Sequence, residues 1–449
     1  MSRAFRACLA TAFGLLAVGC APIAIYRGTV PAPGAVPSFE PSARGAAPSG
    51  DPQGAERFLL PGTADRDHRL AGTLRCDRRG DSLVILIYGD SRRGFRMQYR
   101  VREMAALRGI RFRNWRSMGA ALGVLPWTLV ASIVPSLDGP RDLVTKLVTH
   151  RPRAGAEKRV LGAVTRALPA DLIVHTGDLV AYGERGRLWE DFTALHAPLR
   201  DRALFVSAVG NHERMDLDIS RYNSNAVMGL PPAPERYWFA LDLPDSAGRF
   251  VFLDSNLLTD TQGRYPDSLQ EALSNQELDW ADSALATAGR YRFVIMHHPP
   301  ISAGHYTGMW APGSASARAA MRRRRLFDIC RRRHVTAVFA GHEHLYARAW
   351  VRIPEGGGFW QVTSGGGGAP PHWVKPQARV RALSQPLPDG LQVEPGSAFG
   401  QTKYHYCRLV IPRGSPARPS LPLDTYEVLS NGAIRKIDHL DLAPDTESR

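Results

Sequence analysis

Cysteine is scarce in this sequence. It has five among 449 residues, and no two are spaced as a Cys-x-x-Cys pair. Because such pairs are the usual sequence sign of a structural zinc site, the sequence predicts none. Cys330 ends an apolar run and is expected to be a buried thiol. Cys76 and Cys407 could form a disulfide in an oxidising compartment, and the sequence leaves that pairing open.

Acidic residues are fewer than basic ones. The sequence has 42 Asp and Glu against 57 Lys and Arg, a formal net charge of +15. This excess should attract anionic partners, such as phosphorylated substrates, acidic lipid headgroups or nucleic acid. Arginines gather at 322–325 and 331–333, beside a predicted helix, and the simplest interpretation is a solvated helix face. No aromatic residues alternate with them to stack bases, so nucleic acid is not an expected partner.

The first apolar run, residues 7–18, is too short to cross a membrane. Two arginines precede it, and Ala-Val-Gly-Cys follows at 17–20. This arrangement resembles a bacterial lipoprotein signal peptide, with an ordinary signal peptide as the alternative. The resemblance assigns residues 1–19 to an export signal. It implies that Cys20 is lipidated and anchors the protein in the cell envelope, at the outer membrane or the periplasmic face.

The rest of the chain divides by composition. Residues 20–56 are rich in Pro, Gly and Ala, and we predict a flexible tether because such a segment cannot build a core. Residues 57–449 are enough for one large domain. Within that domain the sequence predicts an apolar insertion near residues 103–150.

Five short motifs place polar residues directly after apolar segments that are typical of buried strands. Side chains at the carboxyl ends of strands in an α/β sheet converge on one edge, where such folds bind their ligands. Taken singly, each motif has a structural explanation, such as a turn, a helix cap or a hydrogen-bonded histidine. The recurrence of the same setting instead predicts one shared site. The motifs are Gly89-Asp90, Gly177-Asp178, Asn211-His212-Glu213, His297-His298 and His342-Glu343-His344.

The residue types in these motifs indicate a pair of metal ions. Two divalent ions about 3.5 to 4 Å apart activate a water molecule and stabilise both the attacking and the departing oxygen of a phosphoryl transfer. Such a pair needs a bridging carboxylate, which Asp178 could provide. The motif set therefore predicts a two-metal phosphoester hydrolase.

The order of the motifs, between residues 82 and 346, resembles the calcineurin-like metallophosphoesterase superfamily, and most closely its purple acid phosphatase branch. The resemblance implies an α/β fold, a four-layer α/β/β/α sandwich of two mixed sheets flanked by helices. It also implies a pair of Fe, Mn or Zn ions and places His212 as proton donor to the leaving oxygen or as a clamp on the phosphoryl group. The implied ligands are Asp90 and His344 for the first ion, Asp178 for both, and Asn211, His297 and His342 for the second.

Two positions depart from the family pattern. Most of the superfamily has Asp-x-His at the first motif, where this chain has Asp90-Ser91-Arg92. Purple acid phosphatases have a tyrosine three residues after the bridging aspartate, where this chain has Ala181, with Tyr182 next to it. A tyrosinate ligand is therefore not expected. Arg92 is predicted to bind the phosphoryl group through its guanidinium fork, with a solvated loop cation as the alternative.

The resemblance implies hydrolysis of a phosphomonoester by a hydroxide that bridges the metals. Two alternatives stay open. One is a phosphodiesterase that acts on cyclic nucleotides or phospholipid headgroups. The other is a metal-binding envelope lipoprotein without turnover, in which the altered first motif leaves one ion bound.

The insertion contains 21 uncharged residues, 117–137. Its length would allow a membrane span, but a single crossing would separate Asp90 from Asp178, and Pro126 and Pro135 interrupt a continuous helix. Two interpretations remain: a buried helical hairpin, or a surface loop that enters the membrane interface beside the lipid anchor.

Other segments predict scaffold. Residues 237–242 and 250–254 should be paired strands, and 404–437 should close a sheet. Ser274 and Glu277 form a capping-box pattern that predicts a helix start. Tyr306 is expected to border the substrate pocket.

Overall fold

The computed structural model describes part of the chain in detail. The predicted signal peptide, tether and insertion, together with Cys76, Tyr182 and Tyr306, lie outside that part. The described residues are 81–92, 155–181, 183, 186–215, 237–259, 267–303, 317–352, 357–372, 383, 392–394, 396–412 and 420–442.

The first sheet is mixed and has the strand order β14-β13-β12-β1-β2-β3. Strands β1, β2 and β3 are parallel to one another, and β12 joins β1 in the antiparallel direction. The predicted C-terminal strands therefore complete this sheet. The strand bounds are β1 Ser82–Tyr88, β2 Leu172–His175, β3 Leu204–Ser207, β12 His405–Pro412, β13 Pro422–Val428 and β14 Ile434–Asp441.

The second sheet is also mixed, with the order β10-β8-β9-β7-β6-β5-β4 and β11 beside β8. Strands β5, β6, β7 and β9 are parallel, whereas β4 pairs antiparallel with β5 as predicted. The strand bounds are β4 Phe239–Asp242, β5 Gly248–Phe252, β6 Tyr291–Ile295, β7 Ala337–Ala340, β8 Tyr346–Arg352, β9 Gly358–Ser364, β10 Gln392–Val393 and β11 Phe399–Gln401.

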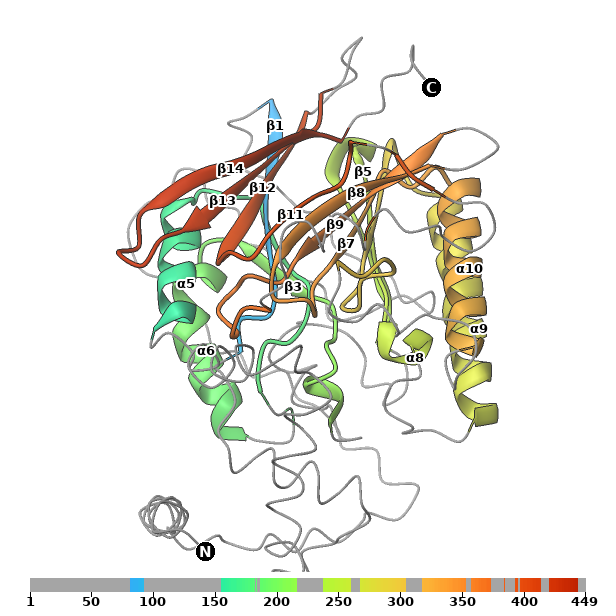
Figure 1. Ribbon diagram of the computed structural model, residues 1–449, viewed down its shortest axis with the longest axis horizontal. Helices are drawn as coiled ribbons and strands as arrows, with labels where there is room; N and C mark the ends of the chain where they lie inside the picture. The colour runs from blue at the N-terminus through green and yellow to red at the C-terminus, as the bar shows by residue number, and fades with distance from the viewer. Residues whose placement is uncertain are drawn as a thin grey trace, which may run out of the picture. The chain divides into compact units, whose positions relative to one another are not determined.

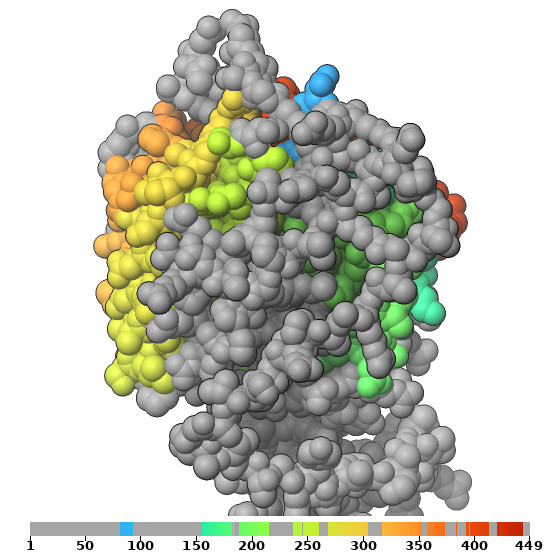
Figure 2. All heavy atoms as spheres, turned by 180° about the vertical axis from the view of Figure 1, so that it is seen from behind, coloured from blue at the N-terminus to red at the C-terminus, as the bar shows by residue number. Residues whose placement is uncertain are grey.

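Helices cover the outer faces of both sheets (Figure 1). Helices α5 (Ala156–Arg166) and α6 (Gly186–Arg200) lie on the first sheet, and α9 (Asp267–Ala286) and α10 (Ala317–Arg332) on the second. Helix α8 (Ser255–Thr259) packs against α9 and α10. Seen from behind, α9 (yellow) lies on the left and α6 (green) on the right (Figure 2). Short 3-10 helices occupy Glu213–Met215 and Pro244–Ser246. This arrangement confirms the predicted α/β/β/α sandwich.

The central strands are mostly apolar because both of their faces are buried. In β6, Phe293 belongs to the core between the sheets, whereas the next residue, Val294, belongs to the core beneath the helices. Phe250 and Val251 of β5 divide in the same way. Because successive side chains of a strand point to opposite faces of the sheet, one run of apolar residues contributes to both cores.

The capping-box prediction is wrong. Helix α9 already begins at Asp267, so Ser274 lies inside it and its hydroxyl donates to the carbonyl of Glu271 at 3.0 Å. Glu277 is buried and accepts the backbone N–H of Asp254 at 2.5 Å. The local pattern predicted a cap, but tertiary burial gave Glu277 a partner in another loop.

The arginine-rich helix is only partly solvated. Arg322 is buried and pairs with Glu271 of α9 at 2.7 Å, and Arg323 donates to the carbonyl of Pro300 at 3.3 Å. The prediction of a solvated face is therefore wrong for these two residues, which connect α10 to its neighbours. Arg325 pairs with Asp279, which extends the contact between the two helices.

Both described cysteines are buried free thiols. This confirms the prediction for Cys330. The Cys407 sulfur lies 3.4 Å from the hydroxyl oxygen of Thr425 and takes no part in a disulfide in this structure. Across the described ranges, no helix has the length and apolar character needed to cross a membrane.

Candidate metal centre

The predicted ligands lie where parallel strands of both sheets end. Asp90 follows β1, Asp178 follows β2, and His342 follows β7. These three residues have positive φ angles of 57°, 59° and 64°. Such left-handed backbone is uncommon for residues other than glycine, and strain of this kind concentrates at functional sites. The loop after each strand is thus shaped to turn a polar side chain toward the sheet edge.

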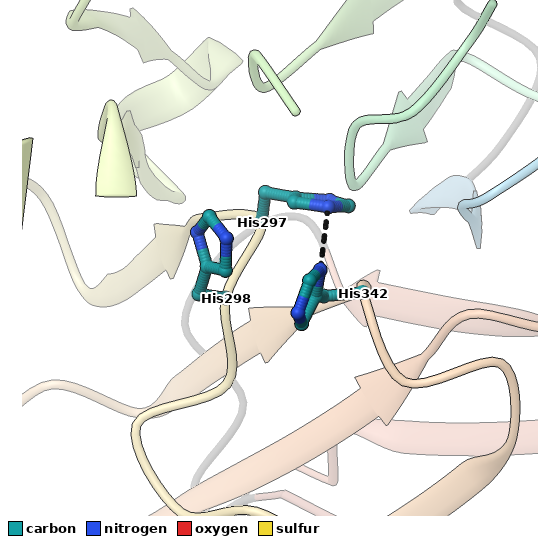
Figure 3. Close-up of side chains that lie close together, drawn as sticks. All are labelled: His297, His298 and His342. Atoms are coloured by element: carbon teal, nitrogen blue, oxygen red, sulfur yellow. Dashed lines mark hydrogen bonds between the residues drawn. The ribbon is translucent and has the colours of Figure 1, made fainter. Parts of the chain in front are cut away.

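One half of the site gathers around His297. Its Nε2 lies 2.9 Å from Asn211 Oδ1 and 3.3 Å from Asp178 Oδ1. His342 Nδ1 lies 3.2 Å from His297 Nε2 and 3.0 Å from Asn211 Oδ1 (Figure 3). The four ligands predicted for the second ion are therefore in direct contact, although they come from four different strand ends.

Asp90 and His344 form the other half. Their Oδ1 and Nε2 atoms are 3.3 Å apart, and both residues are buried. Asp90 Oδ2 accepts the backbone N–H of His342 at 2.9 Å. Within the described ranges, no hydrogen-bond donor reaches Asp90 Oδ1. A buried carboxylate oxygen in this state fits a metal cation, since burial of an unpaired charge is costly.

Backbone carbonyls orient two of the imidazoles. His297 Nδ1 donates to the carbonyl of Thr176 at 2.9 Å, and His344 Nδ1 donates to that of Pro370 at 2.5 Å. A neutral ring whose Nδ1 carries the proton presents the lone pair of Nε2, which is the arrangement typical of metal-binding histidines. Both Nε2 atoms face the site. The donor set, two carboxylates, one amide oxygen and three imidazoles, suits Fe, Mn or Zn.

Arg92 lies inside the site. Its Nε donates to Asp178 Oδ2 at 3.0 Å, and its Nη2 lies 3.4 Å from His344 Nε2. With 6% of its surface exposed, it is not a solvated loop cation. The structure therefore excludes that alternative and places the guanidinium against two predicted ligands.

His212 lies beside the same carboxylate. Its backbone N–H donates to Asp178 Oδ1 at 3.0 Å, and its Nε2 is 3.7 Å from Asp178 Oδ2. Its Nδ1 lies 2.8 Å from the carbonyl of Ala181, the position at which purple acid phosphatases carry tyrosine. Here that position supplies a backbone carbonyl, which needs no particular side chain. Burial, and then the nearby Arg92 cation, lower the pKa of His212 to about 3.

The two aspartates differ in their electrostatic surroundings. Burial raises the pKa of Asp90 to about 8, and the nearby His297 and Arg92 offset only part of that effect. Asp178 is equally buried, but His212, His297 and Arg92 together hold its pKa well below the ordinary value. Asp178, the carboxylate predicted to bridge the ions, is therefore the one whose ionised form its surroundings favour.

Two buried glutamates hold the loops that carry the ligands. Glu213 accepts the backbone N–H groups of Gly210 at 2.7 Å, Asp178 at 3.0 Å and Val180 at 3.1 Å. Glu343 accepts the N–H of Ala303 at 2.6 Å. Sequence reasoning assigned neither residue a role. Their position next to predicted ligands, in Asn-His-Glu and His-Glu-His, was the available signal.

Two further histidines adjoin the predicted ligands. His298 lies with His297 and His342 in a group that could hold a metal ion (Figure 3). Its Nδ1, however, lies 2.9 Å from the hydroxyl of Ser255, which also receives the backbone N–H of His298 at 2.9 Å. His372 stacks on His344 with ring centroids 4.1 Å apart, and its Nδ1 accepts the His344 N–H at 3.1 Å. Sequence reasoning did not single out His372, because no strand-end pattern precedes it.

Glycines allow the loops to approach this closely. A Cβ on Gly365 would lie 2.3 Å from the carbonyl oxygen of Glu343 and 2.8 Å from Asp90 Oδ2. A Cβ on Gly210 would lie 2.3 Å from Asp178 Oδ1. All three distances are shorter than a Cβ atom tolerates in real structures. The glycine-rich segment after β9 therefore packs against the first ligand loop.

Comparisons with known proteins found one family model and several solved structures that are similar to this chain. A family model described as calcineurin-like phosphoesterase matches residues 149–346. Among solved structures, a purple acid phosphatase from yellow lupin seeds is similar, with 14% identity and a TM-score of 0.49, over 86% of this chain and 55% of that chain. GAP50, the anchor in the inner membrane complex of Plasmodium, shows 12% identity and a TM-score of 0.41, over 80% and 89% of the two chains. The present chain thus spans 55% of the length of the lupin protein. No curated protein matches the sequence.

Proposed function

We propose that the chain is a metal-dependent phosphoester hydrolase that acts on phosphomonoesters, and the match of residues 149–346 to the calcineurin-like phosphoesterase model supports this. One observation carries the proposal. Six potential metal ligands from five separate strand ends meet in one buried site, with a cationic side chain among them. A structural role alone would not require two carboxylates and three imidazoles to converge.

The residues fit two ions. Asp90 and His344 would hold one, Asp178 would contact both, and the remaining ligands named above would hold the other. When bound, the ions would act as Lewis acids on the phosphoryl oxygens and supply a nucleophilic water at neutral pH. Fe, Mn and Zn all suit these ligands.

The protein would contribute charge and positioning. Arg92 offers a planar fork of donors that matches the geometry of a phosphoryl group. His212 Nδ1 faces the carbonyl of Ala181, so a proton on Nε2 requires the imidazolium, which the negative charge of a bound phosphoryl group would favour. In that form His212 would give a proton to the leaving oxygen or hydrogen-bond the phosphoryl group. A buried surrounding strengthens both interactions, because the effective dielectric constant is lower than in water.

Hydrolysis of p-nitrophenyl phosphate and bis-p-nitrophenyl phosphate tests the proposal. The mature chain would be reconstituted with Mn, Zn or Fe, and metal content would be measured on the same samples. Faster hydrolysis of the monoester with two ions per chain would support it. Preference for the diester would reassign the chain to phosphodiesterases, and inactivity with one bound ion would support a metal-binding envelope protein.

We also propose that the protein is exported and anchored in the cell envelope through lipidated Cys20. The N-terminal sequence pattern supports this proposal. Expression of the full chain and of Cys20→Ser, followed by membrane fractionation and mass spectrometry of the N-terminus, tests it. A mature N-terminus at which Cys20 carries no lipid would contradict the anchor, and Cys20→Ser should bind membranes less than the parent.

A further inference from the structure

Arg92 joins two residues that are predicted to bind the first ion. Its guanidinium reaches Asp178 Oδ2 through Nε at 3.0 Å and His344 Nε2 through Nη2 at 3.4 Å. Because His344 Nδ1 donates to the carbonyl of Pro370, its Nε2 is the lone-pair atom and acts as the acceptor. The lone pair that a metal would use is therefore directed at the guanidinium.

The backbone fixes this position. The Arg92 N–H donates to the carbonyl of Asp178 at 3.2 Å, and the Asp90 N–H donates to that of Gly177 at 3.0 Å. These two bonds hold the loops after β1 and β2 side by side. The side chain of residue 92 must then enter the site, two residues after Asp90, at the place where most of the superfamily has a histidine ligand.

The charge of Arg92 also matters. Its side chain is 7% exposed and that of Asp178 is 1% exposed, so solvent screens the pair weakly. Arg92 does not reach Asp90 Oδ1, for which no hydrogen-bond donor exists in the described part of the chain. The guanidinium thus contacts two of the three ligands predicted for the first ion, Asp178 and His344, and not Asp90 Oδ1.

We propose that Arg92 is an internal cation that competes with the first ion for Asp178 and His344. The two sites then differ in affinity. The site formed by Asn211, His297 and His342 binds its ion tightly, whereas the site formed by Asp90 and His344 binds an ion only when Arg92 moves away. The displaced guanidinium stays within reach of a bound phosphoryl group. This inference rests on the proposed function only in assuming that the centre binds metal.

A competing Arg92 and an Arg92 that only orients Asp178 predict opposite changes in metal affinity when Arg92 is replaced. If Arg92 competes, its removal strengthens binding of the weaker ion. If Arg92 merely orients Asp178, its removal weakens binding of both ions. Arg92→Gln keeps hydrogen-bonding capacity without charge, whereas Arg92→Lys keeps the charge without the fork. Arg435→Gln is a matched control, since Arg435 is an exposed arginine that pairs with Glu427 on β13.

Equilibrium dialysis of the metal-free mature chain against Mn²⁺ or Zn²⁺, with metal analysis and no substrate, measures both affinities. We expect the parent and Arg435→Gln to bind the ion on the Asn211, His297 and His342 side at least about tenfold more tightly than the ion on the Asp90 and His344 side, because entry of the latter breaks a buried ion pair. Arg92→Gln should strengthen binding of the weaker ion about tenfold and leave the affinity for the tighter ion unchanged, with Arg92→Lys in between. Circular dichroism would check that each variant is folded.

Equal affinities in the parent, or weaker binding in both Arg92 variants, would overturn the inference. Because the readout is metal binding, its failure is separate from failure of the proposed function. If Arg92→Gln binds the weaker ion more strongly and the parent hydrolyses no phosphoester, the competition holds and the hydrolase is rejected.

Discussion

Glu213 accepts the backbone N–H of Asp178 at 3.0 Å and so connects the loop after β3 to the predicted bridging ligand. The same carboxylate holds the N–H groups of Gly210 and Val180. Glu213→Ala would leave three N–H groups without this acceptor. We expect the free energy of unfolding to fall by about 3 kcal/mol or more, with weaker metal binding. Urea denaturation of the metal-free protein measures the first effect.

The control for Glu213 is Glu394→Ala. Glu394 is a partly exposed residue whose carboxylate lies 3.5 Å from Arg352. We expect a change within about 1 kcal/mol. Similar losses in the two variants would show that Glu213 contributes no more than a surface ion pair.

Asp178→Ala should remove both activity and tight metal binding. Asp178 contacts His297 on one side and Arg92 on the other, so its loss affects both halves of the site. Hydrolysis of p-nitrophenyl phosphate and metal content would be measured together. Retention of two ions by the variant would show that Asp178 does not bridge them.

His212→Ala should keep the metal content and lower turnover. A general acid typically contributes 10²- to 10⁴-fold, and the contribution is largest when the leaving group is a poor one. We therefore expect a greater loss with an alkyl phosphate than with p-nitrophenyl phosphate. The same proportional loss with both esters would rule out proton donation by His212.

Two glycines predict opposite effects of the same substitution. Gly210→Ala would bring a methyl group to 2.3 Å from Asp178 Oδ1 and should disturb the site. Gly162 lies within α5, and its nearest neighbour to a new Cβ is the flexible Arg166 side chain at 3.5 Å. Gly162→Ala should raise stability by about 0.5 to 1 kcal/mol and leave activity unchanged. Thermal unfolding and turnover of both variants check this pair, and a fully active Gly210→Ala would show that the loop can move.

His196 should make the fold sensitive to acid. It is buried in α6 and stacks on Phe192 with ring centroids 4.0 Å apart. Burial lowers its pKa from 6.5 to about 3. Below pH 6.5 the unfolded chain binds a proton that the folded chain does not, so stability falls as pH falls. Between pH 7.5 and 5 this amounts to about 2 kcal/mol.

His196→Leu removes that titration. We expect the variant to lose about 2 kcal/mol less than the parent over the same pH range, as measured by urea denaturation at each pH. The comparison isolates one residue, because other buried histidines titrate equally in both proteins. Equal losses in parent and variant would show that His196 is not the cause.

The apolar segment 117–137 is proposed to enter the membrane interface. A soluble form that lacks the lipid anchor should bind vesicles of anionic phospholipid, and deletion of residues 118–137 should reduce that binding. Sedimentation with the vesicles measures it. Unchanged binding after the deletion would support the alternative of a buried hairpin.

Much of the fold and of the ligand set could be predicted from the sequence, because the information is local. A strand such as β6 is buried on both faces, so its apolar run is continuous and ends visibly at His297. The topology of α/β folds then brings such strand ends to one edge, which is why ligands far apart in the chain were expected together. The family pattern supplied the four-layer arrangement.

Contacts between elements decided the rest. Ser274 and Glu277 matched a helix start, yet α9 begins upstream and Glu277 serves the loop after β5. Arg322 was predicted to be a solvated cation, but packing of α9 against α10 buries it beside Glu271.

The sequence by itself determined which residues could bind metal, since side-chain chemistry and strand period are local properties. Only the tertiary structure decided that Arg92 points between Asp178 and His344. Its direction depends on hydrogen bonds between the loop after β1 and the loop after β2, which are far apart in the sequence. The same holds for Glu213, which accepts hydrogen bonds from the N–H groups of Asp178 and Val180 in the loop after another strand, β2.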